Sequence, residues 1–372
     1  MSRGRLDLVR QRLGQHLGHR SLRAFETPSD VVQSFGAVQA QDYLGSLWAI
    51  GLRLPGSREA DIERALADKS IVRTWPMRGT LHIVAAADVR WMLALLTPAI
   101  VARGARRLAE LDIGEADLRR SRKALVRALQ GGRQRTRKNV YEVLEAAKVS
   151  TAGQRGIHVL WRLAQEGLVC FGARDGKQPT FVLLDEWVPP APALQPDEAL
   201  AAIAERYFGG HGPATLADFT WWSGLPVGKA REGLESVRAR LEREVVGDGT
   251  YWYSRHGAAV AGRSPKVSRV HLLPAFDEYL VGYRDRRVVL AANQSVNNGW
   301  GLLSPTVLVN GSVAGTWGRE LRGAAVTVAL APFEPLKAVD SKALQGVVND
   351  YGEFLGKTAS IRVRTRPRTV RR

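Results

Sequence analysis

The sequence predicts an α+β fold in which tandem winged-helix (helix-turn-helix) domains are followed by a C-terminal β-barrel. Helical patterns followed by two β-rich runs recur along the chain. A proline-rich stretch separates two of these groups, and strand patterns dominate from Val267 onward. A chain of 372 residues is too long for one ordinary core, so we expect several domains.

The first winged helix is expected over residues 1–117. Its helices are expected near Leu8–Leu17, from Asp30 into the segment Val38–Gln41, and over Ala60–Leu66. The runs Ile71–Trp75 and Thr80–Val84 then predict a hairpin.

The second winged helix, residues 118–190, has the clearest pattern. Apolar residues at helical spacing predict helices over 118–129, 140–144 and 156–166. Two β-rich runs, 168–172 and 178–184, follow around the turn Arg174–Lys177.

The third winged helix is expected over residues 195–262, because the linker Pro189–Ala193 precedes it. Helices are predicted over 199–207, 215–219 and 227–240. A hairpin with a Gly-Asp-Gly turn is predicted over 245–253.

The C-terminal β-barrel is expected over residues 263–372, which include a basic tail; the strand pattern alone also allows a small sheet over 265–335. Strands are predicted over 288–290, 307–309, 313–317 and 325–330, and a helix over 341–351. Asn310-Gly311 is a strong two-residue hairpin turn.

The net charge of +18, rich in arginine, indicates a polyanionic partner. Arginine-rich composition also follows from GC-rich coding sequence, so charge alone leaves both explanations open. One cysteine, no membrane-length apolar run and no signal peptide predict a cytoplasmic, nucleoid-associated protein without membrane contact. The scattered histidines predict no metal site, and without cofactor motifs we expect no cofactor.

Two glutamines one residue apart, Gln39 and Gln41, stand in the apolar segment Val38–Gln41. A buried amide must form hydrogen bonds, because an unpaired one costs roughly 2–7 kcal/mol. Such amides bond other protein groups, a water or a nucleobase. The alternative is that the pair only brackets a helix end.

Four segments resemble the AlkZ/YcaQ family of winged-helix DNA glycosylases, in the same order and over most of the chain. They are Val38–Tyr43, Arg73–His82, Leu272–Leu280 and Ser304–Gly311. The resemblance implies tandem winged helices with a C-terminal barrel, and a monofunctional glycosylase that excises bulky or crosslinking N7-alkylguanine lesions from double-stranded DNA. Its catalytic signature is Gln-apolar-Gln in one branch, the branch that Gln39-Ala40-Gln41 follows and that is linked with self-resistance to alkylating natural products.

Glutamine does not titrate, so it supplies neither the acid nor the carboxylate of ordinary glycoside hydrolysis. An N7-alkylated guanine is already cationic and leaves without protonation. Gln39 and Gln41 then need only place a water near C1′ and stabilise the developing sugar cation. Asp42 and His82 are candidates for catalytic support; alternatively, Asp42 caps a helix or pairs with an arginine, and His82 belongs to a local network.

Basic residues on the predicted hairpin and before the predicted helix 140–144 are candidates for DNA contacts. They are Arg73, Arg78, Arg133, Arg135 and Lys138. Alternatively, these basic residues lie in solvated loops and contact no DNA. The other class of function is a non-catalytic DNA-binding protein or transcriptional regulator. Such regulators commonly bind as dimers, whereas we see no dimerisation heptads and expect a monomer.

Overall fold

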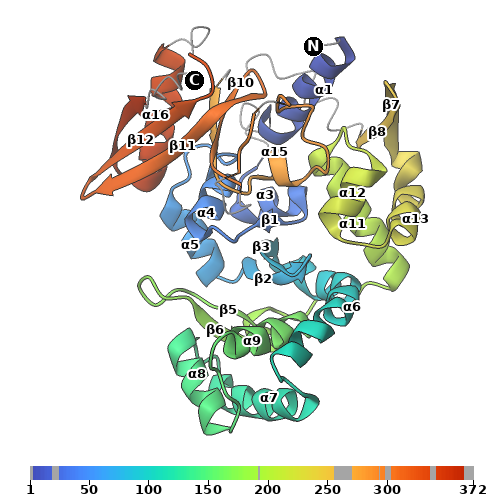
Figure 1. Ribbon diagram of the computed structural model, residues 1–372, viewed down its shortest axis with the longest axis vertical. Helices are drawn as coiled ribbons and strands as arrows, with labels where there is room; N and C mark the ends of the chain where they lie inside the picture. The colour runs from blue at the N-terminus through green and yellow to red at the C-terminus, as the bar shows by residue number, and fades with distance from the viewer. Residues whose placement is uncertain are drawn as a thin grey trace, which may run out of the picture.

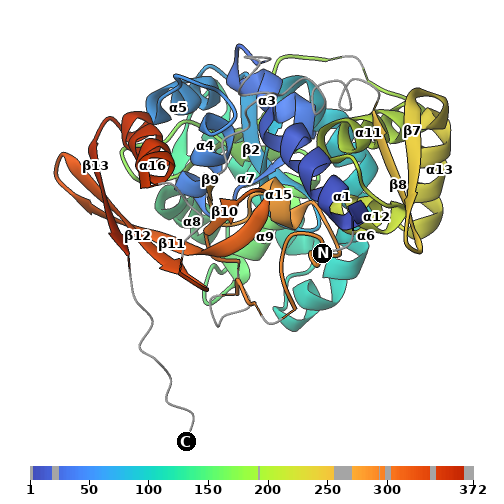
Figure 2. The same ribbon diagram turned by 90° about the horizontal axis from the view of Figure 1, so that it is seen from above.

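The computed structural model describes residues 3–18, 25–191, 193–254, 270–292, 294–297, 303–335 and 341–363. The N-terminal unit occupies the middle of the molecule (Figures 1 and 2). Its elements are α1 (Arg3–Leu13), the π-helical turn η1 (Gly14–Gly18), α3 (Pro28–Phe35), β1 (Val38–Gln39), α4 (Tyr43–Gly51), α5 (Glu59–Ala67), β2 (Ile71–Met77), β3 (Thr80–Ala85) and α6 (Ala86–Glu110).

The glutamine segment starts as a strand over Val38–Gln39 and is not helical at Ala40 and Gln41, so the predicted helix into it is wrong. Helix α3 ends because Gly36 takes a left-handed φ of 74°, which a glycine adopts at little cost. The chain then extends as β1 and pairs antiparallel with β3, with Gln39 opposite His82. The three strands form a sheet in the order β1-β3-β2.

The next unit confirms the predicted order of three helices and a hairpin. Its elements are α7 (Glu115–Leu129), β4 (Arg135–Thr136), α8 (Arg137–Ala146), α9 (Arg155–Gln165), β5 (Val169–Phe171), β6 (Thr180–Leu183) and α10 (Leu184–Trp187). The sheet order is β4-β6-β5. Figure 1 shows this unit at the lower end of the molecule, below β2 and β3.

The third group of helices and its hairpin are also present. The elements are α11 (Pro196–His211), α12 (Leu216–Ser223), α13 (Val227–Val237), the 3-10 turn η2 (Arg238–Arg240), β7 (Leu241–Val246) and β8 (Gly249–Ser254). Strands β7 and β8 pair antiparallel across a turn at Gly247, as predicted.

The C-terminal strands form an open sheet in the order β13-β12-β11-β10-β9. The elements are β9 (Val270–Leu273), α15 (Glu278–Val281), β10 (Thr306–Val309), β11 (Ser312–Arg322), β12 (Ala325–Pro332), α16 (Ser341–Leu355) and β13 (Thr358–Val363). Among the described residues no pairing joins β13 to β9, so the predicted barrel is not found as a closed structure.

Local predictions in this region have mixed outcomes. The Asn310-Gly311 hairpin turn is confirmed, with φ of 52° and 80° at its two residues. The predicted strand over 288–290 is wrong, because this stretch forms turns. Strand β13 was not predicted, and it pairs parallel with β12 through the α16 crossover. Residues 364–372, most of the predicted basic tail, lie outside the described residues.

The hydrophobic cores do not follow the four predicted segments. One core joins the N-terminal unit to the C-terminal sheet, with Trp48, Leu272 and Tyr351 buried in it. A second joins β2, β3 and α6 to α11–α13, and the third belongs mainly to α7–α9. The N-terminal unit is therefore held between the C-terminal sheet and α11–α13, as Figure 2 shows from above. The predicted domain boundaries stay a prediction.

Candidate active site around Gln39 and Gln41

The backbone around the glutamines is held from several sides. Gln39 N–H donates to Oε1 of Glu278 at 3.0 Å, and Ala40 N–H donates to the Leu81 carbonyl at 2.7 Å. The Ala40 carbonyl accepts from Nη2 and Nε of Arg73 at 2.8 and 3.2 Å. These bonds fix the segment at the end of a short strand, where so few residues pair that the ladder alone gives little support.

The two glutamine side chains are hydrogen-bonded to each other. Gln39 is 8% exposed, whereas Gln41 is exposed. Gln39 Nε2 donates to Gln41 Oε1, and Gln39 Oε1 accepts from Arg78 Nη2 at 2.8 Å. The arginine, which only donates, fixes which end of the Gln39 amide is oxygen. The pair therefore has one anchored amide and one that faces solvent.

Arg78 connects three neighbours at the β2–β3 turn. Besides Gln39, it donates to the Trp222 carbonyl and lies 3.2 Å from Nε2 of His82. His82 Nδ1 lies 2.9 Å from the Thr80 carbonyl, so Nδ1 carries the proton and Nε2 accepts from Arg78. Burial, with the nearby Arg78 charge, lowers the pKa of His82 well below 6.5. His82 is thus a neutral, buried support for Arg78.

The buried carboxylate of Glu278 accepts hydrogen bonds from three donors, one of which is the Gln39 backbone. Its Oε1 accepts from Gln39 N–H, and its Oε2 accepts from Trp222 Nε1 at 2.9 Å and lies 3.1 Å from His211 Nε2. Glu278 is 1% exposed. These three hydrogen bonds offset the free-energy cost of burying the charge, and they hold the carboxylate next to the Gln39 N–H.

Glu278 is itself positioned by the start of α15. Asp277 caps this helix through the Tyr279 N–H at 2.9 Å, and a bidentate pair joins Asp277 to the buried Arg53 at 2.8 and 2.9 Å. Arg53 belongs to the turn after α4 and also donates to the Ala49 carbonyl. The segment Asp277–Glu278 therefore connects the C-terminal region to the glutamine motif and to the turn that follows α4.

The other predicted site residues lie in different surroundings. Asp42 is the N-cap residue of α4 without a capping bond from its side chain, and its carboxylate lies over Gly45 in the first helical turn. Arg73 is buried with its guanidinium 4.7 Å from the Phe171 ring, and this burial lowers the pKa of Arg73 to about 10. Arg73 therefore serves the motif backbone instead of facing solvent.

The residues predicted to contact DNA from the second unit are not brought to the glutamines. Arg133 and Lys138 are exposed beside and on α8, which Figure 1 places at the lower end of the molecule. Arg135 is half-buried, and its Nε donates to the Ala128 carbonyl at 3.0 Å. Only Arg133 and Lys138 have the exposure that a phosphate contact requires.

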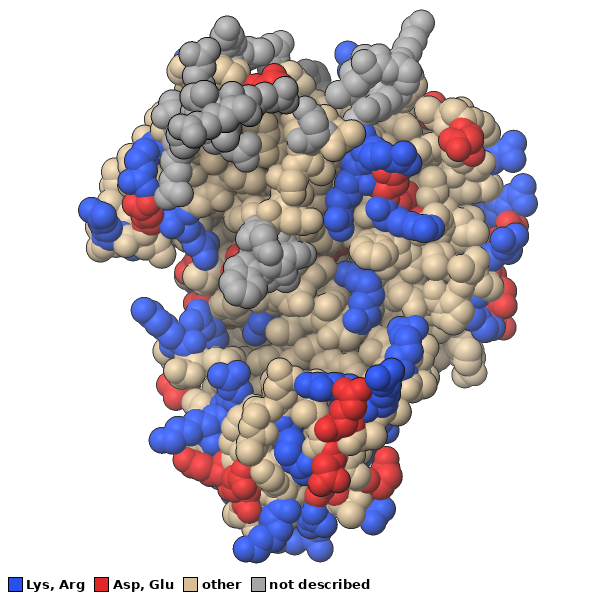
Figure 3. Space-filling view, in the orientation of Figure 1, with Lys and Arg blue, Asp and Glu red and all other residues tan. Residues whose placement is uncertain are grey.

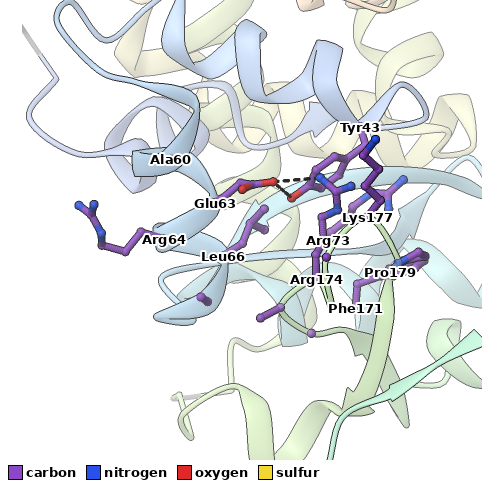
Figure 4. A pocket seen from close by; sticks show the side chains of 14 residues that line it. Tyr43, Ala60, Glu63, Arg64, Leu66, Arg73, Phe171, Arg174, Lys177 and Pro179 are labelled. Carbon is purple, nitrogen blue, oxygen red and sulfur yellow. Dashed lines mark hydrogen bonds and ion pairs between the residues drawn. The ribbon is translucent and has the colours of Figure 1, made fainter. Parts of the chain in front are cut away.

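A pocket of about 430 Å³ opens next to the motif, and we call it the Tyr43 pocket. It lies between α5 of the first unit and the β5–β6 hairpin of the second (Figure 4). Glu63 faces Tyr43 and Arg174 across it, at 3.3 Å from the hydroxyl and 3.0 Å from Nη1. Its lining residues are Tyr43, Ala60, Glu63, Arg64, Leu66, Ala67, Arg73, Phe171, Gly172, Ala173, Arg174, Gly176, Lys177 and Pro179.

Lys and Arg side chains border the hollow on the face shown in Figure 3 and continue over the lower unit. Within the described residues, no group of three acidic, histidine or cysteine side chains is arranged to hold a metal ion. No described helix has the length and hydropathy to cross a membrane.

Sequence reasoning assigned no role to Glu278, although Leu272–Leu280 carries part of the family resemblance. The available signal was two adjacent acids, Asp277 and Glu278, inside an apolar stretch, since buried carboxylates require partners. Trp222 and His211 gave no such signal, because their roles depend on contacts more than 50 residues away in the chain.

Comparison with known proteins agrees with this architecture. The family model described as DNA glycosylase AlkZ-like matches residues 32–354. An interstrand DNA cross-link repair glycosylase of Streptomyces sahachiroi is 28% identical over 345 residues, covering 86% of this chain and 90% of the relative. The solved structure of the Streptomyces sahachiroi DNA glycosylase AlkZ has the same fold, with a TM-score of 0.76, 24% identity, and coverage of 95% of this chain and 98% of that one. The chain therefore belongs to the AlkZ-like family of DNA glycosylases, hydrolases that act on N-glycosyl bonds.

Proposed function

We propose that this glycosylase excises bulky or crosslinking N7-alkylguanine lesions from double-stranded DNA, and that Gln39 and Gln41 place the attacking water. One observation carries the proposal: the two side-chain amides form an anchored pair, and among the described residues no carboxylate bonds to either side-chain amide. Such a pair suits a base that needs no protonation to leave. The relative named for interstrand cross-link repair supports the same class of lesion.

The water is held by oxygen lone pairs. An amide oxygen has two, and Arg78 takes one on Gln39 while Gln39 Nε2 takes one on Gln41. The second lone pair of Gln41 Oε1, on the exposed side chain, accepts a hydrogen bond from the water. Arg78 strengthens this arrangement, because its bond to Gln39 polarises the amide whose N–H₂ orients Gln41.

In the reaction, the C1′–N9 bond breaks and its electron pair neutralises the cationic base. The water oxygen bonds to C1′, and the water proton leaves to solvent. The amide oxygens stabilise the oxocarbenium-like sugar as charge develops. Buried Glu278, which accepts from the Gln39 N–H, adds a fixed negative charge that favours the developing sugar cation.

We further propose that the three helix-and-hairpin units are winged helices, and that exposed cations, including Arg133 and Lys138, contact backbone phosphates. Arg73, Arg78 and His82 then act by positioning the glutamines. Asp42, at the start of α4, contributes charge near the motif without contacting the water.

The test is base excision from a duplex with one bulky N7-alkylguanine, followed by alkaline cleavage of the abasic site under single-turnover conditions. Wild type is expected to release the base, and Gln39→Ala with Gln41→Ala is expected to lose release by roughly 100- to 1,000-fold, as for other positioned polar groups. Gln130→Ala, an exposed glutamine at the end of α7, is the matched control.

Equal release by wild type and the double variant would show that the amides do not place the water. Tight binding of one defined sequence, with no release from any alkylated duplex, would instead support the non-catalytic regulator.

A further inference from the structure

The Tyr43 pocket has an excess of positive charge. Arg73, Arg174 and Lys177 line it together with one carboxylate, Glu63. That carboxylate is already engaged, since its Oε1 accepts from Arg174 and from the Tyr43 hydroxyl. Lys177 is exposed on the β5–β6 turn and has no ion-pair partner among the described residues. The pocket therefore favours a phosphate and disfavours a cationic base.

The same pocket has flat and apolar walls. The Arg174 guanidinium stacks 4.7 Å from the centre of the Tyr43 ring, and such cation–aromatic pairs are surfaces on which bases stack. Leu66 and Pro179 add apolar area, and Ala67 is an exposed small residue on α5 that leaves the space open. A flat uncharged ring attached to a phosphate fits this combination, which is the chemistry of a nucleotide.

The pocket is also joined to the catalytic segment. Tyr43 starts α4 directly after Gln41 and Asp42, and Arg73 of its lining donates to the Ala40 carbonyl. An occupant of the pocket therefore lies close to whatever the two glutamines contact.

We propose that the Tyr43 pocket binds one unpaired nucleotide of the DNA beside the lesion, with its neutral base between α5 and the β5–β6 hairpin and its phosphate on Lys177. This proposal rests on the proposed function. It separates two bases by charge: the cationic lesion stays at the glutamines, and a neutral neighbour enters the pocket. Holding the neighbour out of the stack exposes the sugar of the lesion to the water.

The test compares binding of the full chain to two duplexes with the same tetrahydrofuran abasic analogue. One is fully paired elsewhere, and the other has one unpaired adenine next to the analogue. Wild type is expected to bind the second duplex roughly 5- to 100-fold more tightly, as expected for one stacked base. Lys177→Ala and Ala67→Trp, which fills the pocket from an exposed position, are expected to remove this preference.

Matched controls are Lys123→Ala on α7 and Ala146→Trp on α8, both exposed positions outside the pocket, and both are expected to keep the preference. Equal binding of the two duplexes by wild type, or an unchanged preference in Ala67→Trp, would overturn the proposal. A titration with free deoxyadenosine monophosphate separates the sources: if it binds and Lys177→Ala abolishes that binding while the duplexes do not differ, the pocket serves a free nucleotide and the proposal is wrong.

Binding to these analogues needs no excision, so failure of the two ideas is distinguishable. A preference for the unpaired adenine that persists in Gln41→Ala, together with unchanged excision in that variant, removes the water-positioning role and leaves the pocket standing. Loss of excision in Gln41→Ala, with no preference for the unpaired adenine in wild type, supports the water-positioning role and rules out the proposed role of the pocket.

Discussion

Arg78 Nη2 donates a hydrogen bond to Gln39 Oε1 over 2.8 Å, and the same guanidinium lies 3.2 Å from His82 Nε2. The orientation of the first glutamine therefore depends on a residue of the β2–β3 turn.

Replacing Arg78 should misplace Gln39 without removing it. Arg78→Lys retains the charge but cannot span Gln39, His82 and the Trp222 carbonyl at once. We expect the single-turnover excision rate to fall roughly 100-fold while the affinity for lesion DNA changes little. Arg103→Lys, at an exposed position on α6, is the control. A fall in affinity with an unchanged rate would show that Arg78 binds DNA instead.

Gln41 should be replaceable by a residue with oxygen acceptors and not by one without them. Gln41→Met preserves size and removes both polar atoms, so we expect the excision rate to fall by roughly 100-fold or more. Gln41→Glu keeps two acceptor oxygens and should retain most of the rate on a cationic base. Excision that survives in Gln41→Met would refute the assignment.

Glu278→Gln should lower the free energy of unfolding. The carboxylate accepts from Gln39 N–H, Trp222 Nε1 and His211, and an amide must turn its N–H₂ toward one of these donors. We expect a loss of roughly 3 kcal/mol in urea unfolding, because hydrogen bonds to charged groups are worth about 1.5–3 kcal/mol each. Glu235→Gln, an exposed residue of α13, should leave stability unchanged. An equal midpoint for both variants would contradict this reading of Glu278.

His82 should make the fold less stable as the pH falls below 6.5. Its pKa is depressed in the folded state, so below the unfolded pKa the unfolded chain binds a proton that the folded chain does not. Stability is then lost by about 1.4 kcal/mol per pH unit from this one group. His82→Gln cannot titrate and should show a shallower decline between pH 6.5 and 5. The same slope for both proteins would mean that His82 titrates normally.

Two basic residues of the second unit should behave differently. Lys138 is exposed at the start of α8, so Lys138→Ala should weaken duplex binding. The slope of log K against log salt concentration should become smaller by about 1. Arg135→Ala should mainly reduce stability, because its Nε bonds the Ala128 carbonyl. Filter binding over a salt series measures the first effect, and urea unfolding measures the second. Weaker DNA binding in Arg135→Ala together with lower stability in Lys138→Ala would contradict both assignments.

Local patterns predicted much of the fold, because they depend on neighbours in sequence. Apolar spacing located α9, and Asn310-Gly311 located the β10–β11 turn. Helix α4 escaped prediction because Gly45–Gly51 is buried on all sides and shows no polar face. Strand β13 escaped because its pairing with β12 is parallel and depends on a crossover.

The candidate site divides in the same way. The two glutamines stand out in the sequence because they are polar residues in an apolar stretch, and a family resemblance gave them a proposed role. Their supports were not visible. Glu278 stands 239 positions from Gln39, and nothing in the spacing of residues indicates which backbone N–H a buried carboxylate will meet.

That separation also orders events during synthesis. A nascent chain that has not yet passed residue 278 cannot complete the hydrogen bond under Gln39, and Trp48 waits equally for the carbonyl of Leu272, 224 positions later. The glutamine motif leaves the ribosome early, but its hydrogen bond to Glu278 forms only after some 239 further residues have been made. Chains that terminate before residue 278 would thus contain the whole motif and yet lack the buried carboxylate that holds its backbone.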